Sequence, residues 1–316
     1  MPSLAAVKAA NAKYAPPTPP VAVFFGGTSG IGRGTAQAFA RYTSGNAHIV
    51  IVGRNKAAAD ELLAALPKHE GQTLAHEFIA CDTSLMKNVD AVTRQLVEKL
   101  PKINFLCISS GNMTLLGRKD TEEGIDYRMA VQYYSRWKII HDLVPLLRAA
   151  AGGGEVATVL NVLDPARGIA IADTEDFGLK KPGNFTPLKA LQVLPTYTSL
   201  TMEEFGLRNP NVSFIHIAPG FVNTNNFNSN HWSMRLAAPI IRPAIWAFAS
   251  SPEVCAEYML YAMLNAKKGF SRVGEKADDM GLKSFPYPDE KPRKELREKV
   301  WAHTVKEVEV QEAIGS

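Results

Sequence analysis

Cysteine is scarce in this sequence. The 316 residues include three cysteines, Cys81, Cys107 and Cys255, and no two of them form a Cys-x-x-Cys pair. Three widely separated thiols are too few for a disulfide framework, and they lack the ligand spacing of structural zinc sites. We therefore expect no metal site, and we predict a reducing location, the cytoplasm.

The sequence also lacks long apolar runs and clusters of like charge. The longest apolar stretch near the C-terminus, residues 236–249, contains Arg242 and two prolines and is shorter than the ~20 residues of a membrane-spanning helix. Residues 1–20 lack the continuous apolar core of a secretory signal. The 35 basic and 31 acidic residues are spread along the chain. We expect no membrane span and no nucleic-acid partner.

What the sequence does contain is a repeated alternation of short apolar runs and helical patterns. The runs predict strands at residues 21–25, 48–52, 74–80, 103–108, 156–162 and 212–217. Helical patterns lie between them, and the strands are almost continuously apolar. This alternation predicts a parallel sheet with helices on both faces. We expect an α/β fold, a Rossmann-type doubly wound sheet in a single domain.

The predicted domain, residues 21–285, has an extension at each end. Residues 1–20 indicate a short helix and a stiff, proline-rich linker. Residues of about 225–250 are predicted to form a helical substrate lid. Residues 286–316 predict a charged C-terminal helix, either an exposed appendage or a support for the lid.

A glycine-rich turn joins the first predicted strand to the following helix. Glycines in this setting allow a tight turn and let a pyrophosphate approach the helix N-terminus. The strand, turn and helix together favour a nucleotide site over an ordinary turn. The predicted phosphate-binding residues are Gly26, Thr28, Ser29, Gly30, Ile31 and Gly32.

The spacing Gly26-x3-Gly30-x-Gly32 resembles the short-chain dehydrogenase/reductase family. Further similarities extend over residues 21–225: an Asp at the adenine-binding position, a Ser-Ser-Gly in place of Asn-Ala-Gly, and a Pro-Gly-x3-Thr near the nicotinamide. The resemblance implies that Asp82, Ser109, Ser110, Gly111, Pro219, Gly220, Val222 and Thr224 also bind the cofactor. Asp82 equally suits a helix N-cap.

The residues after the second strand indicate the type of cofactor. An acidic residue there binds the ribose 2′-hydroxyl group, whereas an arginine accommodates a 2′-phosphate. This sequence has Gly53 and Arg54, and Arg33 adds a cation where members of the resembled family that prefer NADP often carry Lys or Arg. We expect NADP(H), the alternative being that both arginines are solvated surface charges.

The catalytic residues that the resemblance implies are mostly replaced. Tyr197 matches the family's proton-donating Tyr, but Thr201 stands at its Lys, Asp164 at its Ser and Gln132 at its Asn. We predict that Tyr197 and Asp164 serve as the acid and the polar anchor of the reaction. Asp164 is also a candidate for the acid, since a carboxylic acid can donate a proton. Without the Lys, no nearby ammonium lowers the pKa of Tyr197. The alternatives are a core aromatic at Tyr197 and a turn cap at Asp164 before Pro165.

Three functions are compatible with these residues. The first is NADP(H)-dependent reduction of a carbonyl or imine in a hydrophobic small molecule, since residues 225–249 are rich in Trp and Ile. The others are an NADP(H)-binding pseudo-enzyme and a non-redox cyclase or isomerase. Segments 176–181 and 214–220 resemble a divergent fungal branch that is linked to secondary metabolism. Core packing or a subunit contact also explains the apolar segment, and the expected assembly is a homodimer or homotetramer.

Overall fold

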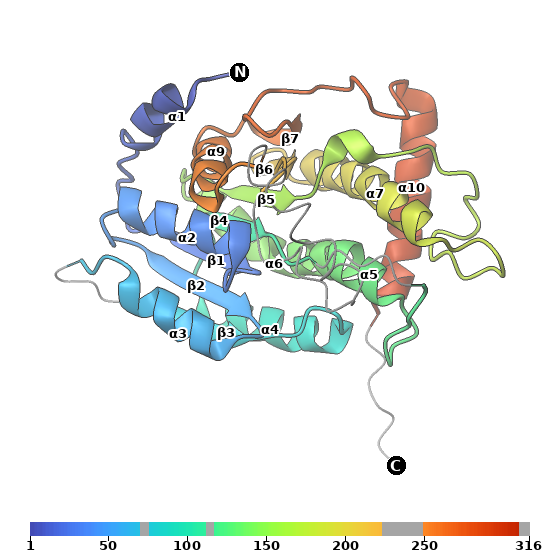
Figure 1. The fold of residues 1–316 in the computed structure, drawn as a ribbon, viewed down its shortest axis with the longest axis horizontal. Helices are drawn as coiled ribbons and strands as arrows, with labels where there is room; N and C mark the ends of the chain where they lie inside the picture. The colour runs from blue at the N-terminus through green and yellow to red at the C-terminus, as the bar shows by residue number, and fades with distance from the viewer. Residues whose placement is uncertain (70–75, 112–116, 223–248, 310–316) are drawn as a thin grey trace, which may run out of the picture.

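The computed structural model describes residues 1–69, 76–111, 117–222 and 249–309. Seven parallel strands form one sheet in the order β3-β2-β1-β4-β5-β6-β7 (Figure 1). They are β1 (Val21–Phe25), β2 (His48–Gly53), β3 (Glu77–Ala80), β4 (Phe105–Ile108), β5 (Thr158–Val162), β6 (Ser213–Ile217) and β7 (Gly269–Val273). This order confirms the predicted doubly wound α/β fold.

Helices cover both faces of the sheet (Figure 1). One face packs against α2 (Gly30–Tyr42), α3 (Lys56–Ala65) and α9 (Pro252–Leu264), and α1 (Leu4–Asn11) lies on α9. The other packs against α4 (Met86–Lys99), α6 (Ser135–Gly152) and α7 (Pro187–Arg208), and α10 (Glu290–Glu307) lies on α7. Short α5 (Tyr127–Met129) and the π-helical turn Ala130–Tyr134 precede α6. No helix of these described ranges is both long and apolar enough to cross a membrane.

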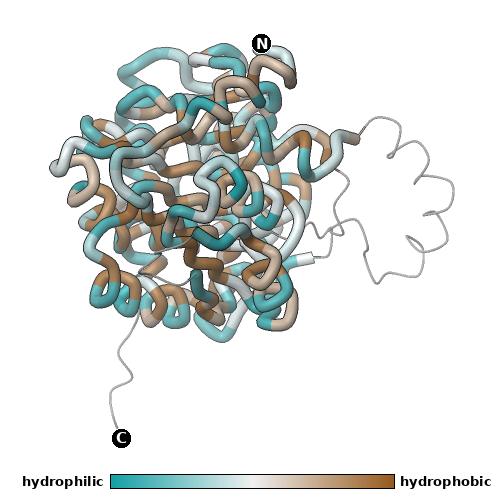
Figure 2. The backbone as a smooth tube through the Cα atoms, turned by 90° about the vertical axis from the view of Figure 1, so that its left-hand side faces the viewer, coloured by the Kyte–Doolittle hydropathy of each residue, from teal (hydrophilic) through white to brown (hydrophobic). Residues whose placement is uncertain are grey.

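Strand β1 shows why the central strands are apolar throughout. All five of its residues are buried. Val23 and Phe25 pack toward the α4 and α6 side, whereas Ala22 and Phe24 pack toward the α2 and α9 side. A strand covered on both faces needs no polar alternation. Figure 2 shows this arrangement as brown, apolar backbone in the interior with teal, polar segments around it.

Strand β7 is the element that the sequence analysis missed. It forms one edge of the sheet, and three of its five residues are only partly buried. Its sequence, Gly-Phe-Ser-Arg-Val, mixes polar and apolar residues, so it lacks the continuous apolar run that identified the other strands. The remaining six strands lie within a few residues of the predicted ranges.

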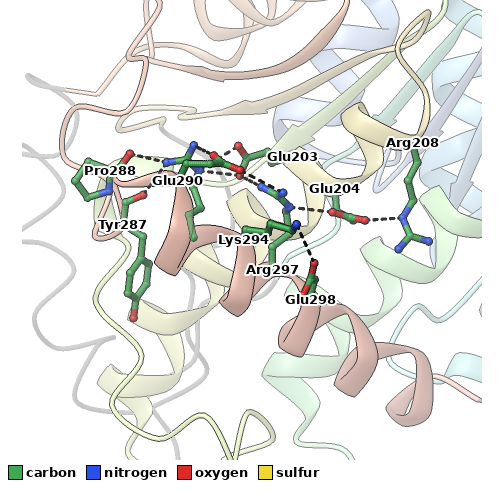
Figure 3. A network of polar contacts seen from close by, with 10 residues as sticks. Glu203, Glu204, Arg208, Tyr287, Pro288, Glu290, Lys294, Arg297 and Glu298 are labelled. Carbon is green, nitrogen blue, oxygen red and sulfur yellow. Dashed lines mark hydrogen bonds and ion pairs between the residues drawn. The ribbon is translucent and has the colours of Figure 1, made fainter.

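The C-terminal helix α10 is attached to α7 by a network of ion pairs (Figure 3). Arg297 contacts Glu203 at 3.1 Å and Glu204 at 2.9 Å, and Arg293 contacts Glu203 at 3.1 Å. Both arginines are buried, with 4% and 7% of their surface exposed. The alternative of an exposed appendage is therefore wrong. Support for the lid stays a prediction, because residues 223–248 lie outside the described ranges.

Candidate nucleotide-binding site

A cleft opens at the carboxyl ends of the central strands. The chain passes from β1 to β2 and β3 on one side and then returns to β4 on the other, a reversal that leaves a ligand-binding crevice in parallel sheets. The predicted residues that line it are Gly26, Thr28, Ser29, Gly30, Ile31, Arg54, Asp82, Ser109, Ser110 and Gly111. Gly53, Cys81, Thr83, Tyr127 and Val131 also line it, without having been assigned to the site.

The glycine turn leaves no room for side chains. A Cβ on Gly26, whose φ is +82°, would lie 2.5 Å from the Ser110 nitrogen. A Cβ on Gly32 would lie 2.3 Å from Ser109 Oγ. The Ser29 side chain forms no cap hydrogen bond at the start of α2, so it leaves the first amides of that helix to bind an anion. These residues fit the pyrophosphate of a dinucleotide.

One of the two predicted cations lies in the cleft. Arg54 is exposed there, and its Nη1 donates a hydrogen bond to the Tyr127 hydroxyl at 3.3 Å. Arg33 does not line the cleft, and its guanidinium instead pairs with Glu61 on α3 at 2.7 Å. The sequence after β2, Gly-Arg-Asn-Lys, contains no carboxylate. Of the two arginines, Arg54 therefore lines the cleft and Arg33 does not.

Asp82 faces the same end of the cleft. Its Oδ1 accepts a hydrogen bond from the Ser84 amide at 3.0 Å. The residue that caps α4 is Leu85, so the N-cap alternative for Asp82 is wrong. A carboxylate at the end of β3 remains available to the nucleotide, and its contact with adenine stays a prediction.

The other end of the cleft is built on β4. Ser109 Oγ donates to the carbonyl oxygens of Phe25 and Gly26 at 3.3 and 3.4 Å, which ties β4 to the glycine turn. Ser110 Oγ is buried and makes no hydrogen bond with the described residues. Behind it, Arg136 on α6 donates to the Ser110 carbonyl oxygen at 2.6 Å. The sequence analysis missed Arg136, because α6 also carries Lys138 and Arg148 and no local pattern separates Arg136 from them.

Tyr197, Thr201 and Gln132 lie outside the cleft. Tyr197 is 1% exposed, and its ring packs against Tyr133 and Phe177 with centroid distances of 5.5 and 5.6 Å. Burial raises the pKa of Tyr197 far above its usual value. Thr201 Oγ1 donates to the Tyr197 carbonyl oxygen at 2.9 Å, and Gln132 is buried in the π-helical turn. In the structure Tyr197 is a buried aromatic residue of the core, which was the alternative interpretation.

Asp164 caps a short turn. Its Oδ1 accepts from the Ala166 amide at 3.0 Å, and its Oδ2 pairs with Arg167 Nε at 3.0 Å. Both oxygens are thus engaged within the 3₁₀ turn Pro165–Arg167. The structure does not bring Asp164, Tyr197, Thr201 and Gln132 into one site, because local hydrogen bonds and core packing hold each of them separately.

The predicted residues beyond β6 that the structure describes, Pro219, Gly220 and Val222, do not line the cleft. Gly220 has a φ of +69°, and a Cβ there would lie 2.3 Å from Glu275 Oε2. Val222 is buried and pairs with Ser250 in an isolated bridge. Pro219 accepts a weak hydrogen bond from the Cys255 thiol at 3.5 Å. Thr224 and residues 225–248 of the predicted lid lie outside the described ranges.

Comparison with known proteins gives the family. Residues 20–163 match a family model described as short chain dehydrogenase. The chain is 40% identical over 230 residues to Oxidoreductase AN1596 of Emericella nidulans, covering 73% of this chain and 66% of the relative. It is 33% identical over 268 residues to Oxidoreductase andH of Emericella variicolor, covering 84% and 76%. The chain belongs to the short-chain dehydrogenase family.

The fold of a solved structure agrees with this assignment. The NADPH-bound carbonyl reductase from chicken fatty liver superposes with a TM-score of 0.58 at 14% sequence identity, covering 83% of this chain and 98% of that one. The family model and the oxidoreductase relatives make this chain an oxidoreductase of the short-chain dehydrogenase type. Its fold is one that binds nicotinamide cofactors.

Proposed function

We propose that this short-chain dehydrogenase uses NADP(H) to reduce a carbonyl or imine group of a hydrophobic small molecule. Arg54 carries the choice of cofactor. It lies in the cleft at the carboxyl end of β2, where an arginine accommodates a 2′-phosphate. The Tyr127 hydroxyl beside it lines the same cleft.

The remaining cleft residues have matching roles. Gly26 and the first amides of α2 would hold the pyrophosphate, and Asp82 would contact the adenosine half. Ser110 Oγ is buried and has no partner among the described residues. It is available to a polar group of the nicotinamide half of the cofactor, since buried polar groups are normally hydrogen-bonded. When bound, the cofactor supplies the hydride of the reaction.

Two exposed apolar side chains support a hydrophobic substrate. Phe221, four residues after the end of β6, is 62% exposed, and Leu188 at the start of α7 is 61% exposed. The sequence continues from Phe221 into residues 225–249, which include two tryptophans. We infer a hydrophobic substrate from these side chains together with the Trp- and Ile-rich segment that follows Phe221 in the sequence.

The choice of cofactor is tested by measuring the dissociation constants of NADPH and NADH. We expect the wild-type protein to bind NADPH more tightly. Arg54→Ala should weaken NADPH binding roughly 10–100-fold, as expected for the loss of a hydrogen bond between two charged groups, and leave NADH binding unchanged. Arg33→Ala is the matched control and should change neither constant. Equal affinities in the wild type, or tighter NADH, would contradict NADP(H) as the cofactor.

The substrate class is tested by NADPH consumption with apolar ketones, quinones and imines. Small polar carbonyl compounds of the same reactivity serve as the matched set. We expect turnover of at least one apolar compound and slower turnover of its polar counterpart. Turnover restricted to the polar set, or none at all, would overturn the proposed substrate class.

A further inference from the structure

Arg136 is a buried cation in the wall of the nucleotide cleft. Only 3% of its surface is exposed. Its guanidinium donates to the carbonyl oxygens of Ser110 and Val162 at 2.6 and 2.8 Å, and to Asn161 Oδ1 at 2.5 Å. A Cβ on Gly111, which lines the cleft, would lie 3.8 Å from Arg136 Nη2. Arg136 therefore joins the carboxyl ends of β4 and β5 from behind the cleft.

The positive charge of Arg136 has no carboxylate partner in the described part of the chain. Its three acceptors are two backbone carbonyls and one side-chain amide. Its Nε atom is buried without a hydrogen bond there. Residues 112–116 and 223–248 contain no Asp or Glu. Burial lowers the pKa of Arg136 to about 10, so the guanidinium is still protonated at neutral pH.

The titratable groups around Arg136 do not cancel this charge. Burial raises the pKa of the Cys107 thiol to about 12, so Cys107 is neutral. Burial, together with Arg272 and Arg136, lowers the pKa of His216 well below its usual value, so its imidazole is neutral as well. Arg272, the register partner of His216 on β7, carries its own charge and interacts with Asp164. A buried charge without a counter-charge is costly to keep in the fold, even when it is hydrogen-bonded.

The topology indicates which part of a dinucleotide lies near Arg136. Arg54, the residue after β2, marks the half of the cleft for the adenosine ribose. The nicotinamide half therefore belongs on the other side of the switch point, over β4 and β5. The nicotinamide ring is neutral when reduced and carries one positive charge after it has given up a hydride. A fixed cation behind this half of the cleft therefore repels only the oxidised ring.

We propose that Arg136 makes the site bind the reduced cofactor more tightly than the oxidised cofactor, so that the protein loads the hydride donor and releases the spent form. Arg136 thus determines specificity for the redox state of the cofactor. This inference rests on the proposed function only in requiring a nicotinamide dinucleotide in the cleft, and it does not depend on the 2′-phosphate.

The test compares the dissociation constants of NADPH and NADP⁺, and of NADH and NAD⁺, by calorimetry. We expect the wild-type protein to favour the reduced form by about tenfold or more. Arg136→Lys keeps the charge and should keep this ratio. Arg136→Gln should bring the ratio close to one, mainly by tightening the oxidised form. Arg297→Gln removes a buried arginine remote from the cleft and should leave the ratio unchanged.

A merely structural role for Arg136 predicts a different result, in which Arg136→Gln weakens both forms equally. That result would overturn the inference. If Arg136→Gln does not fold, the wild-type ratio decides, because equal wild-type affinities overturn the inference without any variant. Binding of NADH in preference to NADPH with the redox ratio intact would overturn the role of Arg54 and support that of Arg136. Failure of all four dinucleotides to bind would overturn both.

Discussion

Tyr197 packs edge to face against Tyr133, with ring centroids 5.5 Å apart. Phe177 covers another side of the same ring at 5.6 Å, again edge to face. This geometry is the favourable one for aromatic pairs. Burial also raises the pKa of Tyr197, so the phenol stays protonated throughout the physiological range. The ring therefore belongs to the core between α7, the π-helical turn that precedes α6 and the segment at Phe177.

Tyr197→Phe should leave NADPH turnover within about twofold of the wild type, because the ring that packs the core is kept. Tyr197→Ala should lower the free energy of unfolding by about 3–5 kcal/mol, the usual cost of removing a buried aromatic ring. Steady-state kinetics and urea unfolding measure the two effects. A hundredfold loss of turnover in Tyr197→Phe, with unchanged unfolding, would restore Tyr197 as the acid.

Tyr197 and β1 show what the sequence could and could not predict. The apolar run of β1 identifies a buried strand because both of its faces meet helices. Tyr197 was assigned by its match to the family's proton-donating Tyr. Because α7 has 22 residues, a match in sequence does not say which residue of the helix meets the cleft. Arg136 and Tyr127 reach the site through the packing of α6 and the turn before it, which no local pattern encodes.

Gly32→Ala should abolish nucleotide binding and lower the free energy of unfolding by about 1–3 kcal/mol, as overpacking does. The added Cβ would lie 2.3 Å from Ser109 Oγ and 2.6 Å from the Gly26 carbonyl oxygen. Gly152→Ala is the control, since a Cβ there meets nothing within 4 Å. NADPH titration and thermal unfolding give both readouts. Normal binding by Gly32→Ala would contradict the close approach that the turn requires.

Glu155 should make stability depend on pH. It accepts hydrogen bonds from Lys102 at 2.5 Å, Asn104 at 2.8 Å and Thr18 at 3.2 Å, which together lower its pKa, the bond from Lys102 most strongly. A carboxyl whose pKa is lower in the folded state stabilises the fold above its unfolded pKa of about 4.3 and loses this effect as the pH falls.

Wild-type protein should therefore lose more stability than Glu155→Gln between about pH 5 and pH 3. The difference at neutral pH should stay below about 1 kcal/mol, because the pair is partly exposed. Urea unfolding across this range measures both curves. Parallel curves for the two proteins would show that Glu155 contributes nothing through its charge.

Arg297→Gln should lower the free energy of unfolding by about 1–3 kcal/mol. This is less than the cost of leaving a buried carboxylate unpaired, because Arg208 and Arg293 still contact Glu204 and Glu203. Lys294→Gln is the control on the same helix, since Lys294 is 62% exposed and lies 4.0 Å from its partner Glu298. Equal effects of the two substitutions would contradict a stabilising role for the buried part of the network.

The docking of α10 also gives the protein an optical signal. Trp301 on α10 meets Trp137 on α6 with ring centroids 4.9 Å apart, and Arg208 lies over the Trp301 ring at 4.2 Å. The chain has four tryptophans, and the other two are Trp232 and Trp246. If those two are replaced by phenylalanine, the tryptophan fluorescence and the near-ultraviolet circular dichroism of tryptophan come from Trp137 and Trp301, at the contact between α6 and α10. This signal would report the detachment of α10 separately, both with and without a nucleotide in the cleft.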